Sequence, residues 1–148
     1  MGSLRIAVGS DHGGFEQKEQ IAKRLTAEGY EVTDFGCPST ESVDYPDYAA
    51  PVAQTVARGD ADFGILVCGT GIGMMLAANK VKGIRAANVT SIEFAHLARE
   101  HNNANVVTLS GRFVDPELNW QIVQEFLKTE FAGGRHERRV AKIMALEG

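Results

Sequence analysis

The chain has 148 residues, 44% of them hydrophobic and 23% charged, and a formal net charge of -4. This length and composition are typical of one globular domain with its own core. The negative charge does not favour binding to nucleic acid or to an anionic membrane surface. No apolar run approaches the roughly 18 residues of a membrane span, and the N-terminus lacks the apolar region of a secretion signal. We therefore expect a single domain over residues 1–148 that binds neither nucleic acid nor membranes.

The two cysteines, Cys37 and Cys68, lie far apart in the sequence and form no CxxC motif. This spacing favours free thiols in a reducing compartment over a disulfide framework or a zinc site. We expect a cytoplasmic protein without a bound metal.

Apolar runs alternate with segments of helical periodicity along the whole chain. In chain order, we predict a strand at 4–8, a helix at 13–29, a strand at 31–36, a turn-rich loop at 37–46, a helix at 46–59, a strand at 63–67, a helix at 72–80, a strand at 84–89, a helix ending at 100, a strand at 105–110, a helix starting at 115–116 and a last helix at about 136–146. Thr90 or Ser91 caps the fourth helix, and Glu93 is well placed for a capping box.

Five strands that alternate with helices of this length are typical of βαβ units, which form a parallel sheet with helices on both faces. We therefore predict an α/β fold, a Rossmann-like doubly wound three-layer αβα sandwich with a five-stranded parallel sheet. Ligands of such folds lie beyond the C-terminal ends of the strands. The polar clusters at 10–14, 68–73, 101–103 and 110–112 should meet at that edge, although the third lies at a helix end and is harder to place.

The segment CGTGIG at 68–73 follows the most strand-like run of the chain. A dinucleotide fingerprint is not complete here, because Met74 stands at the third glycine position and Asn88 stands where an acidic residue is wanted. A phosphate loop with Gly-Lys-Ser or Gly-Lys-Thr is also absent from the sequence. Two interpretations remain: a nest of backbone N–H groups for an anion, or a tight turn without a ligand.

Cys68 ends this strand beside a helix N-terminus, where the helix dipole favours a thiolate. On its own, Cys68 fits a small core residue better than a reactive thiol, and we expect Cys37 to have that structural role.

Five segments together resemble the type B ribose-5-phosphate isomerase family, which also includes galactose-6-phosphate and allose-6-phosphate isomerases. They are SDHGGFE at 10–16, DYPDYA at 44–49, CGTGIGMMLAANKVKGIRAA at 68–87, REHNNANVV at 99–107 and GGRHERRV at 133–140. The resemblance covers essentially the whole chain in order. It implies an aldose–ketose isomerase of sugar phosphates, such as ribose 5-phosphate and ribulose 5-phosphate, that works without a metal or cofactor.

The resemblance also implies roles for individual residues. Cys68 matches the base that moves a proton between C2 and C1, and His101 matches the residue that helps to open the furanose ring. Some family members use a glutamate at the position of Met74 as the base, so this chain belongs to the thiol branch. The loop whose backbone amides hold the enediolate oxygen comprises Gly69, Thr70, Gly71, Ile72 and Gly73.

The remaining matches are positions that contact the substrate. Among them, Arg135 and Arg139 face the phosphate. The full set is Asp11, His12, Asn102, Arg112, Arg135 and Arg139. The family builds each site from two subunits, which implies a homodimer, or two dimers paired into a tetramer.

General chemistry supports these roles but leaves alternatives. The reaction needs a base poised near neutral pH and preorganised donors for the enediolate, and a histidine is suited to ring opening. Thr70 either donates to the enediolate or only shapes the turn. Asp11 is a helix cap, a substrate contact, or both. Tyr45 lines the site or anchors its loop, and Arg112 equally fits a surface salt bridge.

Arg135 and Arg139 are four residues apart and share a helix face with Arg138 and Lys142 nearby. This basic patch is either a solvated helix face or a phosphate clamp. Two alternative functions remain: a hexose-6-phosphate isomerase of the same family and a nucleotide-binding sensor domain. A third, a non-catalytic subunit of a two-subunit isomerase, is disfavoured because Cys68, His101, Arg135 and Arg139 are all present.

Overall fold

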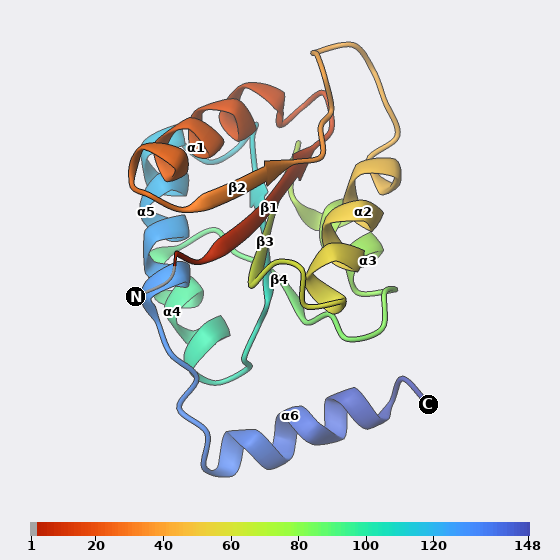
Figure 1. Cartoon of the computed structure of the whole chain (residues 1–148), viewed down its shortest axis with the longest axis vertical. Coiled ribbons are helices and arrows are strands. Elements are labelled where there is room, and N and C mark those ends of the chain that lie inside the picture. The colour runs from red at the N-terminus through yellow and green to blue at the C-terminus, as the bar shows by residue number, and fades with distance from the viewer. Residues whose placement is uncertain (1–2) are drawn as a thin grey trace.

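Five parallel strands form the central sheet of the computed structural model, which describes residues 3–148 (Figure 1). The strands lie in the order β2-β1-β3-β5-β4. Their bounds are Arg5–Ser10 for β1, Glu31–Asp34 for β2, Phe63–Cys68 for β3, Ala86–Asn88 for β4 and Val106–Ser110 for β5. The predicted five-stranded, doubly wound parallel sheet is confirmed. β4 is shorter than predicted because only three of its residues pair with β5.

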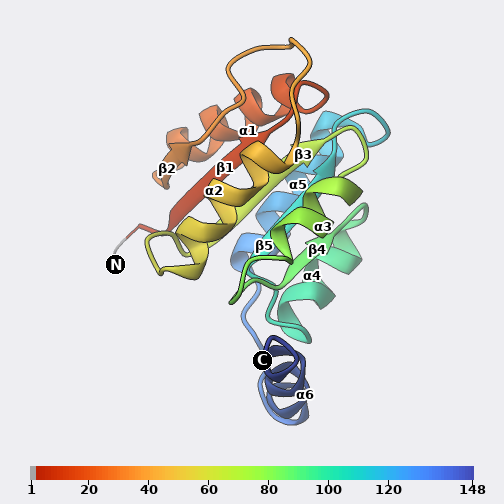
Figure 2. The ribbon, with the colours of Figure 1, turned by 90° about the vertical axis from the view of Figure 1, so that its right-hand side faces the viewer.

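Helices cover both faces of the sheet, with α1, α4 and α5 on one face and α2 and α3 on the other (Figures 1 and 2). Their bounds are Phe15–Ala27 for α1, Pro46–Ala57 for α2, Ile72–Ala78 for α3, Ile92–Glu100 for α4, Pro116–Lys128 for α5 and Arg135–Ala145 for α6. Across the part of the chain described, none of the helices is long and apolar enough to cross a membrane.

The alternation of side chains along the strands separates two hydrophobic cores. On β1, Ile6 and Val8 pack under α1 and α5, whereas Ala7 between them packs with residues of α2 and α3. This is the two-residue period of a strand buried on both faces. The near-continuous apolar runs of the sequence follow from it.

Local signals explain several of the helix ends. Gly29 and Gly59 end α1 and α2 with positive φ values of 95° and 82°, as their sequence positions predicted. Ser91 is the N-cap of α4 and accepts a 3.1 Å hydrogen bond from the Phe94 backbone N–H. Glu93 is therefore not the third helical residue, and the predicted capping box is wrong.

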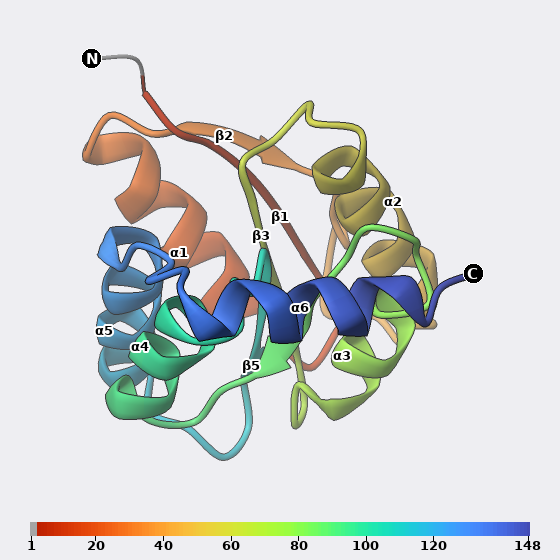
Figure 3. The ribbon, with the colours of Figure 1, turned by 90° about the horizontal axis from the view of Figure 1, so that it is seen from below.

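The last helix, α6, lies outside the sandwich. Figure 3 shows it crossing the end of the molecule where the strands begin, from the side of α4 towards α3. It begins one residue earlier than predicted, and Val140 is its only buried residue. Ile143 and Leu146 are 48% and 86% exposed. The apolar face of α6 is thus largely uncovered in a single chain.

Candidate functional site

Cys68 is the last residue of β3 and is buried, with 5% of its surface exposed. The backbone N–H of Gly71 donates to its Sγ atom over 3.1 Å. Gly71 is the N-cap of α3 and has a left-handed φ of 87°. A Cβ atom there would lie 2.4 Å from Asn88 Oδ1 and 3.0 Å from the Leu109 backbone, so the left-handed φ and the close packing together favour glycine. The sequence therefore folds this loop with a donor aimed at the thiol.

The turns that follow β1, β3 and β5 lie against one another at this edge. A Cβ atom at Gly111 would lie 2.6 Å from the carbonyl oxygen of Gly13, and one at Gly14 would lie 2.4 Å from that of Val67. Only glycines allow the backbones to approach this closely. The prediction that the segments 10–14, 68–73 and 110–112 converge at one edge is confirmed.

Asp11 shapes the first of these turns. Its Oδ1 atom accepts hydrogen bonds from the backbone N–H groups of Gly13 at 2.8 Å and Gly14 at 3.2 Å. The N-cap of α1 is Gly14, so Asp11 orders the turn before the helix and is not the N-cap itself. Its neighbour His12 accepts a hydrogen bond at Nδ1 from the Val43 backbone N–H. This contact ties the loop at 37–46 to the site and assigns the proton of a neutral His12 to Nε2.

Tyr45 and Arg112 reach the same loop from two sides. A Cβ atom at Gly73 would lie 2.6 Å from Tyr45 Cε1, and one at Gly69 would lie 3.4 Å from Arg112 Cδ. The Thr70 hydroxyl accepts a 3.1 Å hydrogen bond from the Ile72 backbone N–H, which is a turn-shaping contact. A cavity of about 450 Å³ opens beside this edge, lined by residues that include His12, Gln17, Thr40, Gly111, Arg112 and Phe113.

His101 and Asn102 lie at the opposite edge of the sheet, and the expectation that they join the first cluster is wrong. His101 is the C-cap of α4, and the chain enters β5 only at Val106, which pairs with Gly64 near the start of β3. A helix that connects parallel strands runs back across the sheet, so its C-terminus lies where the next strand begins. The stretch of β3 from Gly64 to Cys68 spans about 13 Å.

Residues of α6 join His101 at this second edge. The imidazole of His136 stacks on that of His101, with ring centroids 4.3 Å apart and planes 12° from parallel. Burial, followed by the neighbouring His101, Arg135 and Arg139, lowers the pKa of His136, and Glu100 acts against this shift. Arg135 and Arg139 are both exposed on the first turns of α6.

Each chain therefore carries two clusters at opposite edges. One holds Cys68, its glycine loop, Asp11, His12, Tyr45 and Arg112, and the other holds His101, Asn102, Arg135, Arg139 and His136. Reasoning from the sequence missed His136, because its contact with His101 joins two segments that are distant in the chain. The only available signal was its place between Arg135 and Arg139 in GGRHERRV.

The profile of the Ribose/Galactose Isomerase family matches residues 6–143. Among individual proteins, the probable ribose-5-phosphate isomerase B of Mycoplasma pneumoniae is 50% identical over 96% of this chain and 94% of its own length. The ribose-5-phosphate isomerase B of Escherichia coli is 47% identical over 97% of this chain and 96% of its own length.

Solved structures agree with this relationship. The ribose-5-phosphate isomerase B of Clostridium thermocellum superposes with a TM-score of 0.96 at 51% identity, over 97% of both chains. That of Mycoplasma genitalium, solved with bound ribulose-5-phosphate, gives 0.95 at 48% identity, over 99% of this chain and 98% of the other. The chain therefore belongs to the ribose/galactose isomerase family.

Proposed function

We propose that this chain interconverts ribose 5-phosphate and ribulose 5-phosphate through an enediolate, with the Cys68 thiolate as the base. The chain is an isomerase, and it aligns over nearly their whole length with relatives that are named ribose-5-phosphate isomerase B. The observation that carries the mechanism is the position of Cys68 at the end of β3, beneath a loop whose Gly71 N–H points at its sulfur.

The proposed reaction starts with ring opening, assisted by His101 as an acid–base group. Cys68 then removes the proton from C2 of the open aldose, and the electron pair of that C–H bond forms the C1=C2 double bond. The negative charge on the enediolate oxygen is stabilised by backbone N–H groups of residues 69–73. A proton moves from O2 to O1, and Cys68 returns its proton to C1, which gives the ketose.

The separation of the two clusters supports a site shared between two copies of the chain. His101, Arg135 and Arg139 lie at the edge where the strands begin, whereas Cys68 lies where they end. A homodimer that joins the first edge of one chain to the second edge of its partner would complete two sites. Two uncovered apolar residues, Ile143 of α6 and its C-cap Leu146, support this assembly because burial against a partner would stabilise them. Pairing of two dimers into a tetramer is compatible with the same contacts.

Substrate binding divides between the clusters in this proposal. Arg135 and Arg139 hold the phosphate as fixed positive charges. The sugar contacts are Asp11, His12, Tyr45, Asn102 and Arg112. The basic helix α6 is thus the phosphate-binding part of one isomerase domain. Both cysteines are free thiols, which supports a cytoplasmic location.

The test is turnover of the purified protein with ribose 5-phosphate, beside allose 6-phosphate and galactose 6-phosphate, without added metal. We expect activity on ribose 5-phosphate and its loss in Cys68→Ala. The matched control is Cys37→Ser, which keeps a donor for the contact of the Cys37 thiol with the Ser39 carbonyl oxygen and should retain activity. Turnover in Cys68→Ala would overturn the assignment of the base. Activity on a hexose phosphate alone would replace the substrate and keep the mechanism.

A further inference from the structure

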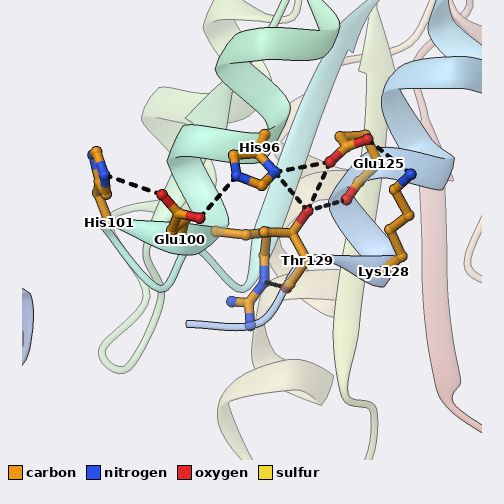
Figure 4. A network of polar contacts seen from close by, with 7 residues as sticks. His96, Glu100, His101, Glu125, Lys128 and Thr129 are labelled. Carbon is orange, nitrogen blue, oxygen red and sulfur yellow. Dashed lines mark hydrogen bonds and ion pairs between the residues drawn. The ribbon is translucent and has the colours of Figure 1, made fainter. Parts of the chain in front are cut away.

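A chain of polar contacts leads from α5 through α4 to His101 (Figure 4). At its centre, His96 Nδ1 lies 2.8 Å from Glu125 Oε2, and His96 Nε2 lies 2.9 Å from Glu100 Oε2. Each nitrogen of this imidazole faces a carboxylate oxygen, which is the arrangement of an imidazolium that donates from both sides. The contacts with Glu125 and then Glu100 raise the pKa of His96, in agreement with the geometry.

Glu125, at the α5 end of this chain of contacts, is held by several neighbouring groups. Glu125 Oε1 lies 3.2 Å from Lys128 Nζ. The Thr129 hydroxyl lies 3.0 Å from Glu125 Oε2 and 2.7 Å from the Glu125 carbonyl oxygen. His96 is therefore held by a carboxylate that is itself held in place.

Glu100 connects His96 to His101. While its Oε2 atom faces His96, its Oε1 atom lies 3.4 Å from His101 Nε2. Glu100 and His101 end α4, and the ring of His101 is bounded on one face by His136. The imidazole is thus restrained at one edge by a carboxylate and on one face by a second ring.

We propose that Glu100 is a positioning residue for His101: anchored by His96, it holds the imidazole in the orientation that opens the sugar ring. This inference rests on the proposed function, in which His101 acts on the cyclic sugar. Glu100 touches His101 and does not need to touch the substrate.

The two directions of the reaction separate this role from a structural one. Ribose 5-phosphate closes a furanose ring through O4 and must open before C2 can react. Ribulose 5-phosphate cannot close a furanose ring, because O5 carries the phosphate. Exchange of its C1 hydrogen with solvent deuterium therefore reports proton transfer by Cys68 alone, whereas formation of cyclic ribose 5-phosphate also needs the ring step.

The experiment incubates ribulose 5-phosphate with enzyme in deuterium oxide and follows C1 exchange and ribose 5-phosphate formation by NMR. For Glu100→Gln, which keeps the side-chain shape, we expect ribose 5-phosphate formation to fall by about tenfold or more. Exchange should stay within about twofold of the wild type. Glu93→Gln, an exposed residue in the first turn of α4, is the matched control and should leave both rates unchanged.

His96→Asn should also lower ribose 5-phosphate formation. The double variant with Glu100→Gln should show no further loss, because the two residues act through one contact. An unchanged ratio of exchange to product formation in Glu100→Gln would overturn the inference, whether both rates fell together or neither changed. A wild-type protein that neither exchanges nor converts ribulose 5-phosphate would instead overturn the proposed function.

Discussion

Replacement of Gly71 by alanine tests the turn that holds Cys68. The φ of 87° at this position costs an L-residue about 1–2 kcal/mol. The added Cβ would lie 2.4 Å from Asn88 Oδ1 and 3.0 Å from the Leu109 backbone, and the required shifts cost about 1–3 kcal/mol more. We therefore expect Gly71→Ala to lower the free energy of unfolding by about 2–5 kcal/mol.

The matched control is Gly59→Ala, because Gly59 also has a left-handed φ, 82°, but a Cβ there would meet nothing within 4 Å. The assay is urea denaturation of both variants at one protein concentration, with isomerase activity measured in parallel. Gly71→Ala should be the less stable variant and should also lose activity, since its N–H no longer points at the Cys68 sulfur. Equal destabilisation by the two substitutions would refute the argument from close packing.

Two further predictions concern the second cluster and its surroundings. Arg135→Ala should raise KM for ribose 5-phosphate by about tenfold or more with little change in kcat, because a charge-assisted contact with phosphate is lost. Arg138→Ala is the control, and equal KM values of the two variants in steady-state kinetics would contradict the binding of phosphate by Arg135. The raised pKa of His96, caused first by Glu125, contributes stability that is fully present below about pH 6.5 and is lost as pH rises through the raised value. The thermal midpoint of the wild type should therefore exceed that of His96→Gln at about pH 6, where Glu125 is still ionised, and the gap should shrink as pH rises. Taking this difference removes the opposite titration of His136. A gap independent of pH would rule out the charged state of His96.

The sequence predicted the fold well because the strands are buried on both faces and the connecting segments have clear ends. Runs such as FGILV at 63–67 have no polar face, which is the pattern of a central parallel strand. Gly29 and Gly59 mark helix ends by a conformation that other residues rarely adopt. The predicted capping box at Glu93 was wrong because Thr90 and Ser91 were both candidate N-caps. Ser91 is the N-cap, so the third helical residue is Phe94 and not Glu93.

The first cluster could also be predicted, because the rule that parallel strands end at one edge places Cys68 beside the turns at 10–14 and 110–112. The same rule failed for His101, which ends a helix and not a strand. The contact of His101 with His136 could not be predicted, since helical periodicity defines the apolar face of α6 but not what lies beneath it. Glu100 escaped notice for the same reason: its significance depends on His96 and on an α5 residue distant in the sequence.

The close glycine turns of the first edge have a consequence for how substrate preference can change in this fold. A methyl group at Gly111 or Gly14 would collide with backbone carbonyl oxygens at 2.6 Å or 2.4 Å, so the floor of the site admits no side chain. In the proposed mechanism, backbone atoms that cannot be exchanged by substitution therefore surround the reacting atoms next to Cys68. In the proposed site, room for one more or one fewer carbon must come from side chains that line the cavity, such as the exposed Thr40. Under that proposal, substitution of these side chains would alter the length of sugar accepted and leave the chemistry at Cys68 unchanged.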